Sequence, residues 1–170
     1  YGALSSLTGG DENTCIGNEA GAAMTSANDN TLLGSYTGDA ITTGSQNTAL
    51  GRASLSTCTT GNGNTATGFK ALDQLTTGSE NTAVGYQAAK SITTALYNTA
   101  IGYNASRDLT TGQSNVTLGI NAGLDITTGS GNLILGTNSG RSGAPSGSIT
   151  TSNNIVCLGD NSIQPLFCAD

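Results

Sequence analysis

Residues 76–92 read "TTGSENTAVGYQAAKSI", and the residues immediately before them, 59–75, read "TTGNGNTATGFKALDQL". The two stretches agree at a pair of threonines, at Asn-Thr-Ala, at two glycines, at an aromatic residue and at a small residue that follows it. A sequence that repeats itself at a fixed interval of 17 residues is typical of an array of equal units, and not of a fold built around one enclosed active site.

The period runs through almost the whole chain. The Gly four residues after the motif Asn appears nine times, and its last interval is 23 residues instead of 17, so the ninth unit carries six extra residues. They correspond to "SGAPSG", residues 142–147, whose Gly, Pro and Ser are typical of a loop. We therefore expect one repeat domain over residues 1–159 and a short connector over 160–170. The motif Asn itself recurs without a slip at Asn13, Asn30, Asn47, Asn64, Asn81, Asn98, Asn115 and Asn132.

The chemistry of the unit favours strands and corners over helices. A Thr stands five residues before every motif Asn, and an apolar residue precedes that Thr. Thr and β-branched residues favour extended backbone, whereas Gly and Asn suit corners that need a positive φ. The sequence thus predicts an all-β fold, a β-solenoid (β-roll) of nine 17-residue coils. Coils stacked at about 4.8 Å would make a rod roughly 40 Å long.

The central strand of each unit is apolar on both sides. Ala is common two residues after the Asn and Ile, Leu or Val three residues after it, and successive side chains of a strand point to opposite faces. With 4% aromatic residues and no Trp, a single coil has a thin core. The small Ala side chains suit the close approach of another copy, so we expect a homotrimer, intertwined or side by side, with the Ala face at the shared axis.

These repeats carry a family resemblance. Stretches such as "NTALGRASLSTCTTGNG" and "NTAVGYQAAKSITTALY" resemble the Asn-Thr-Ala-x-Gly-Tyr-x-Ala repeats of phage tail fibre proteins and related bacterial tail fibre domain proteins. They are similar, less closely, to the left-handed β-roll heads of trimeric autotransporter adhesins, whose repeat is shorter. The resemblance covers residues 1–159, and the C-terminal "CLGDNSIQPLFCAD" resembles the connector that precedes a self-cleaving intramolecular chaperone in many such fibres.

The resemblance implies a trimeric, non-enzymatic structural segment of a virion tail fibre at the extracellular surface. Such a segment acts as a stiff spacer, and its partners are further copies of itself, neighbouring fibre or tail proteins, and a host cell-surface receptor or glycan. A bacterial surface adhesin head is the alternative within the same structural class.

Composition argues against several other classes of function. Five Lys and Arg residues and a net charge of -6 suit nucleic acid poorly, because that binding depends on basic side chains meeting phosphates. The chain has no apolar run of about 18 residues to span a bilayer. It also has no His, so a Ser-His-Asp or Cys-His arrangement is excluded, and no phosphate-binding Gly-Lys loop occurs. We expect no enzymatic activity and no cofactor.

Two breaks in an otherwise uniform surface are candidate sites. Phe69, Tyr86 and Tyr103 fill one slot in successive units, so they are expected to stack and fix the coil register, or to form a platform for a sugar. The insertion is the candidate receptor contact, because a receptor site on a solenoid needs a feature that the repeat lacks. The candidate contact residues there are Arg141, Ser142, Ala144, Pro145 and Ser146.

The remaining polar features have mainly structural interpretations. The Asn row is expected to be buried, with each amide bonding to the next coil. Cys15, Cys58 and Cys157 stand in small or apolar slots and are expected to be free buried thiols, with a Cys157–Cys168 disulfide as the alternative. Calcium at the corner that holds Asp11 and Glu12 is a lesser alternative to no metal site.

An ice-binding solenoid is the rival from another class. Such a protein orders water on a flat face of outward threonines at alternate positions. The paired threonines here, such as Thr42 with Thr43, are adjacent, so one of each pair points inward. The pattern therefore favours a fibre.

Overall fold

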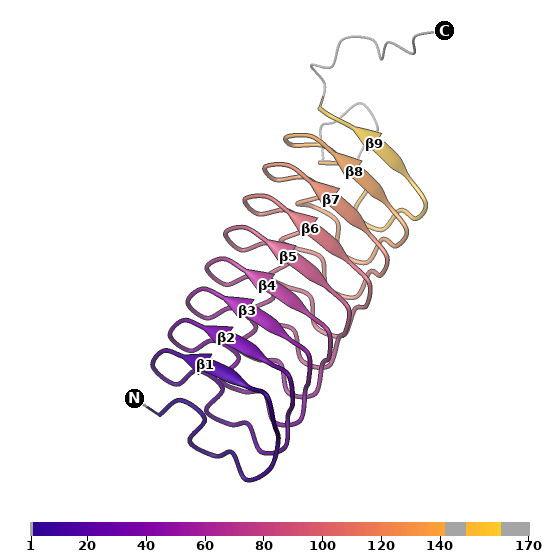
Figure 1. Ribbon diagram of the computed structural model, residues 1–170. Helices are drawn as coiled ribbons and strands as arrows, with labels where there is room; N and C mark the ends of the chain where they lie inside the picture. The colour runs from indigo at the N-terminus through magenta and orange to yellow at the C-terminus, as the bar shows by residue number, and fades with distance from the viewer. Residues whose placement is uncertain (1, 142–148, 161–170) are drawn as a thin grey trace, which may run out of the picture.

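The computed structural model describes residues 2–141 and 149–160, and within them it is a β-solenoid. Nine strands of three residues lie side by side in chain order and form a single parallel sheet along the rod (Figure 1). We number each coil after the strand it contains. The strands are β1 (Thr14–Ile16), β2 (Thr31–Leu33), β3 (Thr48–Leu50), β4 (Thr65–Thr67), β5 (Thr82–Val84), β6 (Thr99–Ile101), β7 (Val116–Leu118), β8 (Leu133–Leu135) and β9 (Val156–Leu158).

The register of the sheet follows the sequence period. Thr48 pairs with Thr65 and Ala49 with Ala66, so equivalent slots of the repeat stand directly above one another. The last pairing, Leu133 with Val156, keeps the same slots although the insertion lies between them. The prediction of an all-β solenoid is confirmed, because each strand begins one residue after the motif Asn or its equivalent.

The inner and outer faces of each strand are the reverse of those we expected. Ala49, Ala66, Ala83 and Ala100 are 0–1% exposed and lie inside the coil, so they cannot face a shared axis. The larger aliphatic residues three after the Asn point outward instead. The reason is steric, because the coil interior is already filled by other slots and has room only for small side chains in the middle of most strands.

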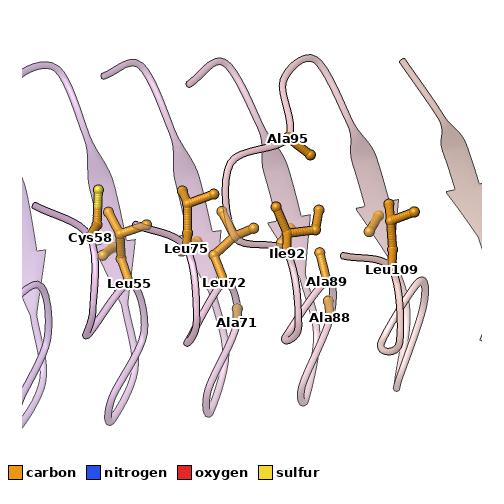
Figure 2. Packing of buried hydrophobic residues seen from close by; sticks show 14 of the residues in the cluster. Leu55, Cys58, Ala71, Leu72, Leu75, Ala88, Ala89, Ile92, Ala95 and Leu109 are labelled. Carbon is orange, nitrogen blue, oxygen red and sulfur yellow. The ribbon is translucent and has the colours of Figure 1, made fainter. Parts of the chain in front are cut away.

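One row of large apolar side chains fills the centre of the solenoid. It comes from the residue just before the first Thr of each pair. Figure 2 shows Cys58, Leu75, Ile92 and Leu109 in line along the rod. Each side chain packs against its equivalents in neighbouring coils, so burial is shared between coils and not achieved within one. The row begins with the half-buried Leu7 and continues with the buried Met24, Ile41, Cys58, Leu75, Ile92, Leu109, Ile126 and Ile149.

A second position in the core is filled from either of two slots of the same coil. In coil 2, Leu32 on the strand faces Gly38, and a Cβ added at Gly38 would lie 2.9 Å from Leu32 Cδ1. In coil 3 the sizes are exchanged, with Ala49 on the strand and the buried Leu55 six residues later. In these two coils the volume is conserved while the chain position that supplies it changes, whereas coils 5 and 6 have small residues in both slots, Ala83 with Ala89 and Ala100 with Ser106. The same pairing joins Ala66 with Leu72, Thr117 with Gly123, and Ile134 with Gly140.

The buried asparagines hold the coils together, as predicted. Asn64 donates both its backbone N–H and its side-chain amide to Oδ1 of Asn47, each at 3.0 Å, and the same amide donates to the carbonyl of Gly78 at 3.0 Å. Its own Oδ1 accepts the two equivalent bonds from Asn81. All the polar atoms of this buried side chain are thus paired, which burial requires. The row ends in coil 9, where the N–H of Ile155 donates to Oδ1 of Asn132 at 2.9 Å.

Threonine hydroxyls form a second ladder at the first Thr of each pair. Thr25 Oγ1 donates to the carbonyl of Thr42 at 3.1 Å, and Thr42 Oγ1 donates to that of Thr59 at 3.0 Å. The second Thr of a pair, such as Thr43, is exposed. The adjacent threonines therefore divide between an intercoil bond and solvent, as the alternation predicts.

Candidate interaction surfaces

The most distinctive surface is the outside of the parallel sheet. We call it the outer sheet face; it consists of the residues one, three and five positions after the Asn slot, such as Val116, Leu118 and Ile120 in coil 7. Large aliphatic side chains run along its middle row and are between 37% and 60% exposed at Ile16, Leu33, Leu50, Ile101, Leu118 and Leu158. An exposed apolar row of this kind makes this face a candidate interaction surface.

The apolar character of this face increases toward the C-terminal coils. In coils 1–6 the strand begins with an outward Thr, from Thr14 to Thr99. In coils 7–9 that position is held by Val116, Leu133 and Val156, which are 37–67% exposed. Arg52 and Asp160 are the only charged residues in the slots of this face. The outer sheet face is therefore nearly uncharged throughout and most hydrophobic at coils 7–9.

The predicted aromatic row lies at one edge of the outer sheet face. The rings of Phe69 and Tyr86 stack at 5.3 Å, and those of Tyr86 and Tyr103 stack at 5.0 Å with only 8° between their planes. The guanidinium of Arg52 lies 5.8 Å from the centre of the Phe69 ring. Because the flat faces of the rings cover one another, what remains exposed is mostly their edges. The expected stacking between coils is confirmed, and the sugar platform stays a prediction.

The predicted receptor loop falls largely outside the described residues, because Ser142, Ala144, Pro145 and Ser146 belong to 142–148. Arg141 is described and is held at the base of the insertion. Its guanidinium donates from Nη1 to Asn138 Oδ1 at 3.2 Å, and its Nε lies 3.8 Å from Asp125 Oδ1. Arg141 is thereby tied to the coil that precedes the insertion.

The cysteines behave as core residues where they are described. Cys58 is a buried free thiol and Cys15 is a half-buried one, and the Cys157 side chain is buried in the core. Burial raises the pKa of both Cys15 and Cys58 to about 11, so both stay protonated at neutral pH and are poor nucleophiles and metal ligands. The alternative of a Cys157–Cys168 disulfide lies outside the described residues. Within residues 2–141 and 149–160 no three Cys, Asp or Glu side chains gather to hold a metal, and this includes the corner of Asp11 and Glu12.

The sequence-based prediction of sites did not include a second break in the repeat, at the corner of Leu96 and Tyr97. Leu96 and Tyr97 stand in slots that are polar, or Gly, in every other unit, and Tyr97 is 60% exposed. The signal was available in the sequence as "TTALYNTA" where the preceding unit has "TTGSENTA".

Comparison with known proteins gives no relative, since no family model, no curated protein and no solved structure matches the chain. No helix in the described part of the chain is long and apolar enough to cross a membrane.

Proposed function

We propose that this chain is a trimeric structural segment of a virion tail fibre, a stiff spacer that also takes part in attachment to the host. The solenoid supplies the rod, since each coil bonds to the next through the sheet, the Asn row and the Thr row. The repeats themselves resemble those of tail fibre proteins, and a bacterial adhesin head is the alternative use of the same architecture.

The outer sheet face carries the proposal of self-assembly. From a spacing of about 4.8 Å per coil and a rise of about 3.4 Å per residue, the face covers on the order of 500 Å² per chain. The apolar part of this area consists of the aliphatic middle row and the first residues of β7–β9, and exposed apolar surface of this kind is often functional. Three copies that turn this face toward a common axis would bury it, which is the role first expected of the Ala face.

The regularity of the face favours an identical partner. Its rows repeat at the coil spacing, and a second copy offers rows with the same spacing, so equivalent side chains can interdigitate along the rod. The lack of charge, apart from Arg52 and Asp160, means that three copies meet without like-charge repulsion over most of the contact.

Multi-angle light scattering of the purified chain at several concentrations tests the assembly. We expect a mass three times the chain mass of 16.8 kDa, with circular dichroism typical of β-structure. A folded monomer across the concentration range would contradict the proposal, because the outer sheet face would then stay in water.

One observation favours ice binding as a second candidate function. The first strand residues of coils 1–6 form an outward row of threonines in register, which is separate from the adjacent Thr pairs. The row consists of Thr14, Thr31, Thr48, Thr65, Thr82 and Thr99. A flat face with hydroxyl and methyl groups at regular spacing can order water. A trimer that buries the face excludes this use, so thermal hysteresis in a solution of monomers would favour the second candidate.

A further inference from the structure

The corner before each strand contains two rows of slots, one and two residues before the Asn. In coils 1–5 these rows carry polar residues or Gly, and in coil 6 they carry Leu96 and Tyr97. Tyr97 is 60% exposed and has a φ of 61°, a left-handed conformation that costs free energy for a bulky residue. A positive φ recurs in this slot of every coil, for example 58° at Glu80 and 57° at Ser114. What sets coil 6 apart is an exposed aromatic ring in a slot that is otherwise polar or Gly, and this is a reason to look for a binding role there.

A hollow follows this corner along the rod. It has a volume of about 500 Å³, and its lining comes from the same two rows in coils 7–9: Gln113, Ser114, Ser130, Gly131, Asn153 and Asn154. The backbone N–H of Ser114 donates to the carbonyl of Leu96 at 3.1 Å, so the hollow begins at the coil that adjoins Tyr97. Gly131, with a φ of 69°, lies beneath the Asn154 side chain, since a Cβ added there would lie 2.5 Å from Asn154 Oδ1.

The hollow offers uncharged hydrogen-bonding groups that the protein leaves unused. Among the described residues, the side chains of Gln113, Ser114 and Asn154 form no hydrogen bond, although an amide supplies both donors and acceptors. Asn153 uses only its oxygen, which accepts the N–H of Ser130 at 2.7 Å. The last charged residue in the two rows is Glu80, one coil before Tyr97. The site therefore combines unpaired amides and hydroxyls with an aromatic ring at its end.

We propose that this hollow, bordered by Tyr97, binds a neutral oligosaccharide. Sugar hydroxyls pair with the amide and hydroxyl groups of the lining, and the C–H face of one sugar ring packs on the Tyr97 ring. An acidic glycan would find no cation in the lining, and an apolar ligand would leave the amides without partners. The inference names the receptor chemistry for the attachment role proposed above, and in that sense rests on it.

The test uses the full chain on an array of neutral, sialylated and sulfated oligosaccharides, followed by calorimetry with the strongest neutral binder. Tyr97→Gly removes the ring and suits the positive φ, so the fold is retained. Tyr36→Gly is the matched control, since Tyr36 is also exposed and has a φ of 57° but lies on another corner in coil 2. Gln113→Ala removes one amide of the lining.

We expect neutral oligosaccharides to bind, with affinity lowered at least tenfold by Tyr97→Gly and by Gln113→Ala and unchanged by Tyr36→Gly. Binding of acidic glycans alone, no glycan binding, or unaltered affinity in Tyr97→Gly would overturn the site. A change of oligomeric state in Tyr97→Gly would assign this residue to the subunit interface and also overturn it. A trimer that binds no sugar disproves the site alone, whereas a monomer that binds sugar disproves the fibre assembly alone.

Discussion

At the scale of single residues, the repeated Gly four after the Asn is required for two reasons. Gly85 has a φ of 138°, which L side chains rarely adopt. A Cβ added there would also lie 2.7 Å from the carbonyl carbon of Gly102 in the next coil. The crowding thus comes from the neighbouring coil and not from a subunit axis, so the slot would exclude a side chain even in a monomer.

We therefore expect Gly85→Val to destabilise the middle of the rod by a few kcal/mol, because the strain and the clash add. Gly9→Val is the matched control, since nothing lies within 4 Å of a Cβ at Gly9 and its φ is not positive. Thermal unfolding monitored by circular dichroism measures both variants. Equal melting temperatures would show that the slot tolerates a side chain.

Asp39 is a residue at which pH should change stability. Burial raises the pKa of its carboxyl group, and the nearby charges of Glu19 and Asp73 raise it further, against a smaller opposing backbone hydrogen bond. One carboxylate oxygen is buried without a hydrogen bond among the described residues. A raised folded-state pKa means that the folded protein favours the protonated acid, so this contribution to stability is lost as the pH rises through that pKa.

Asp39→Asn should consequently raise the melting temperature at pH 7, and the gain should disappear toward about pH 3, where Asp39 is protonated in both states. Asp73→Asn is the control in the same slot two coils on. Its carboxylate accepts a hydrogen bond from Ser56 Oγ at 2.7 Å and lies 3.6 Å from Lys70 Nζ, so its loss should not stabilise. A lower melting temperature for Asp39→Asn at pH 7 would refute the assignment.

At the scale of one coil, the exchange of volume between two slots predicts strong coupling. Ala49→Leu alone overfills the space that Leu55 occupies and should cost about 1–3 kcal/mol. Leu55→Gly alone empties that space and should cost about 2–5 kcal/mol, reduced by relief of the positive φ of 56° at Leu55. The double variant reproduces the arrangement of Leu32 with Gly38 in coil 2.

The double variant is therefore expected to be more stable than either single variant. Denaturant unfolding of the four proteins gives the coupling energy directly, and independent sites would give none. Additive losses would mean that the two side chains do not share one space in coil 3.

The coil also shows which parts of the structure the sequence could predict. The 17-residue period predicted the position of every strand and of the Asn row, because equivalent residues of successive units stack directly above one another. Alternation showed that Ala83 and Val84 point to opposite sides, but it could not say which side is inside, since both are apolar. The deciding signal was the size exchange of Leu32 and Gly38 with Ala49 and Leu55, which requires long-range packing to interpret.

The candidate sites were less predictable for the same reason. A row such as Phe69, Tyr86 and Tyr103 follows from the period, so its stacking was predictable. The hollow of coils 7–9 depends on how six polar or Gly residues of three successive corners are arranged in space, which the slot pattern does not encode.

At the scale of the whole molecule, the outer sheet face is graded along the rod. Its strands begin with Thr in coils 1–6 and with Val or Leu in coils 7–9, and the aliphatic middle row continues through both parts. Since hydrophobic burial is roughly proportional to apolar area, the contact between copies should be strongest at coils 7–9. The trimer proposed above is then expected to be held mainly at its C-terminal part, with the N-terminal coils aligned by it.

Leu118 lies in the centre of that region and is 48% exposed in the single chain. Leu118→Lys would place one unpaired charge per chain in the proposed contact between copies, and an uncompensated buried charge is strongly unfavourable. We expect the trimer to dissociate to monomers at micromolar concentration, with β-structure retained because the side chain points away from the coil interior. Thr111→Lys, at an exposed slot of the same coil, adds the same charge elsewhere and should leave the trimer intact. Light scattering of both variants decides the matter: an intact Leu118→Lys trimer would show that the copies do not meet through the outer sheet face.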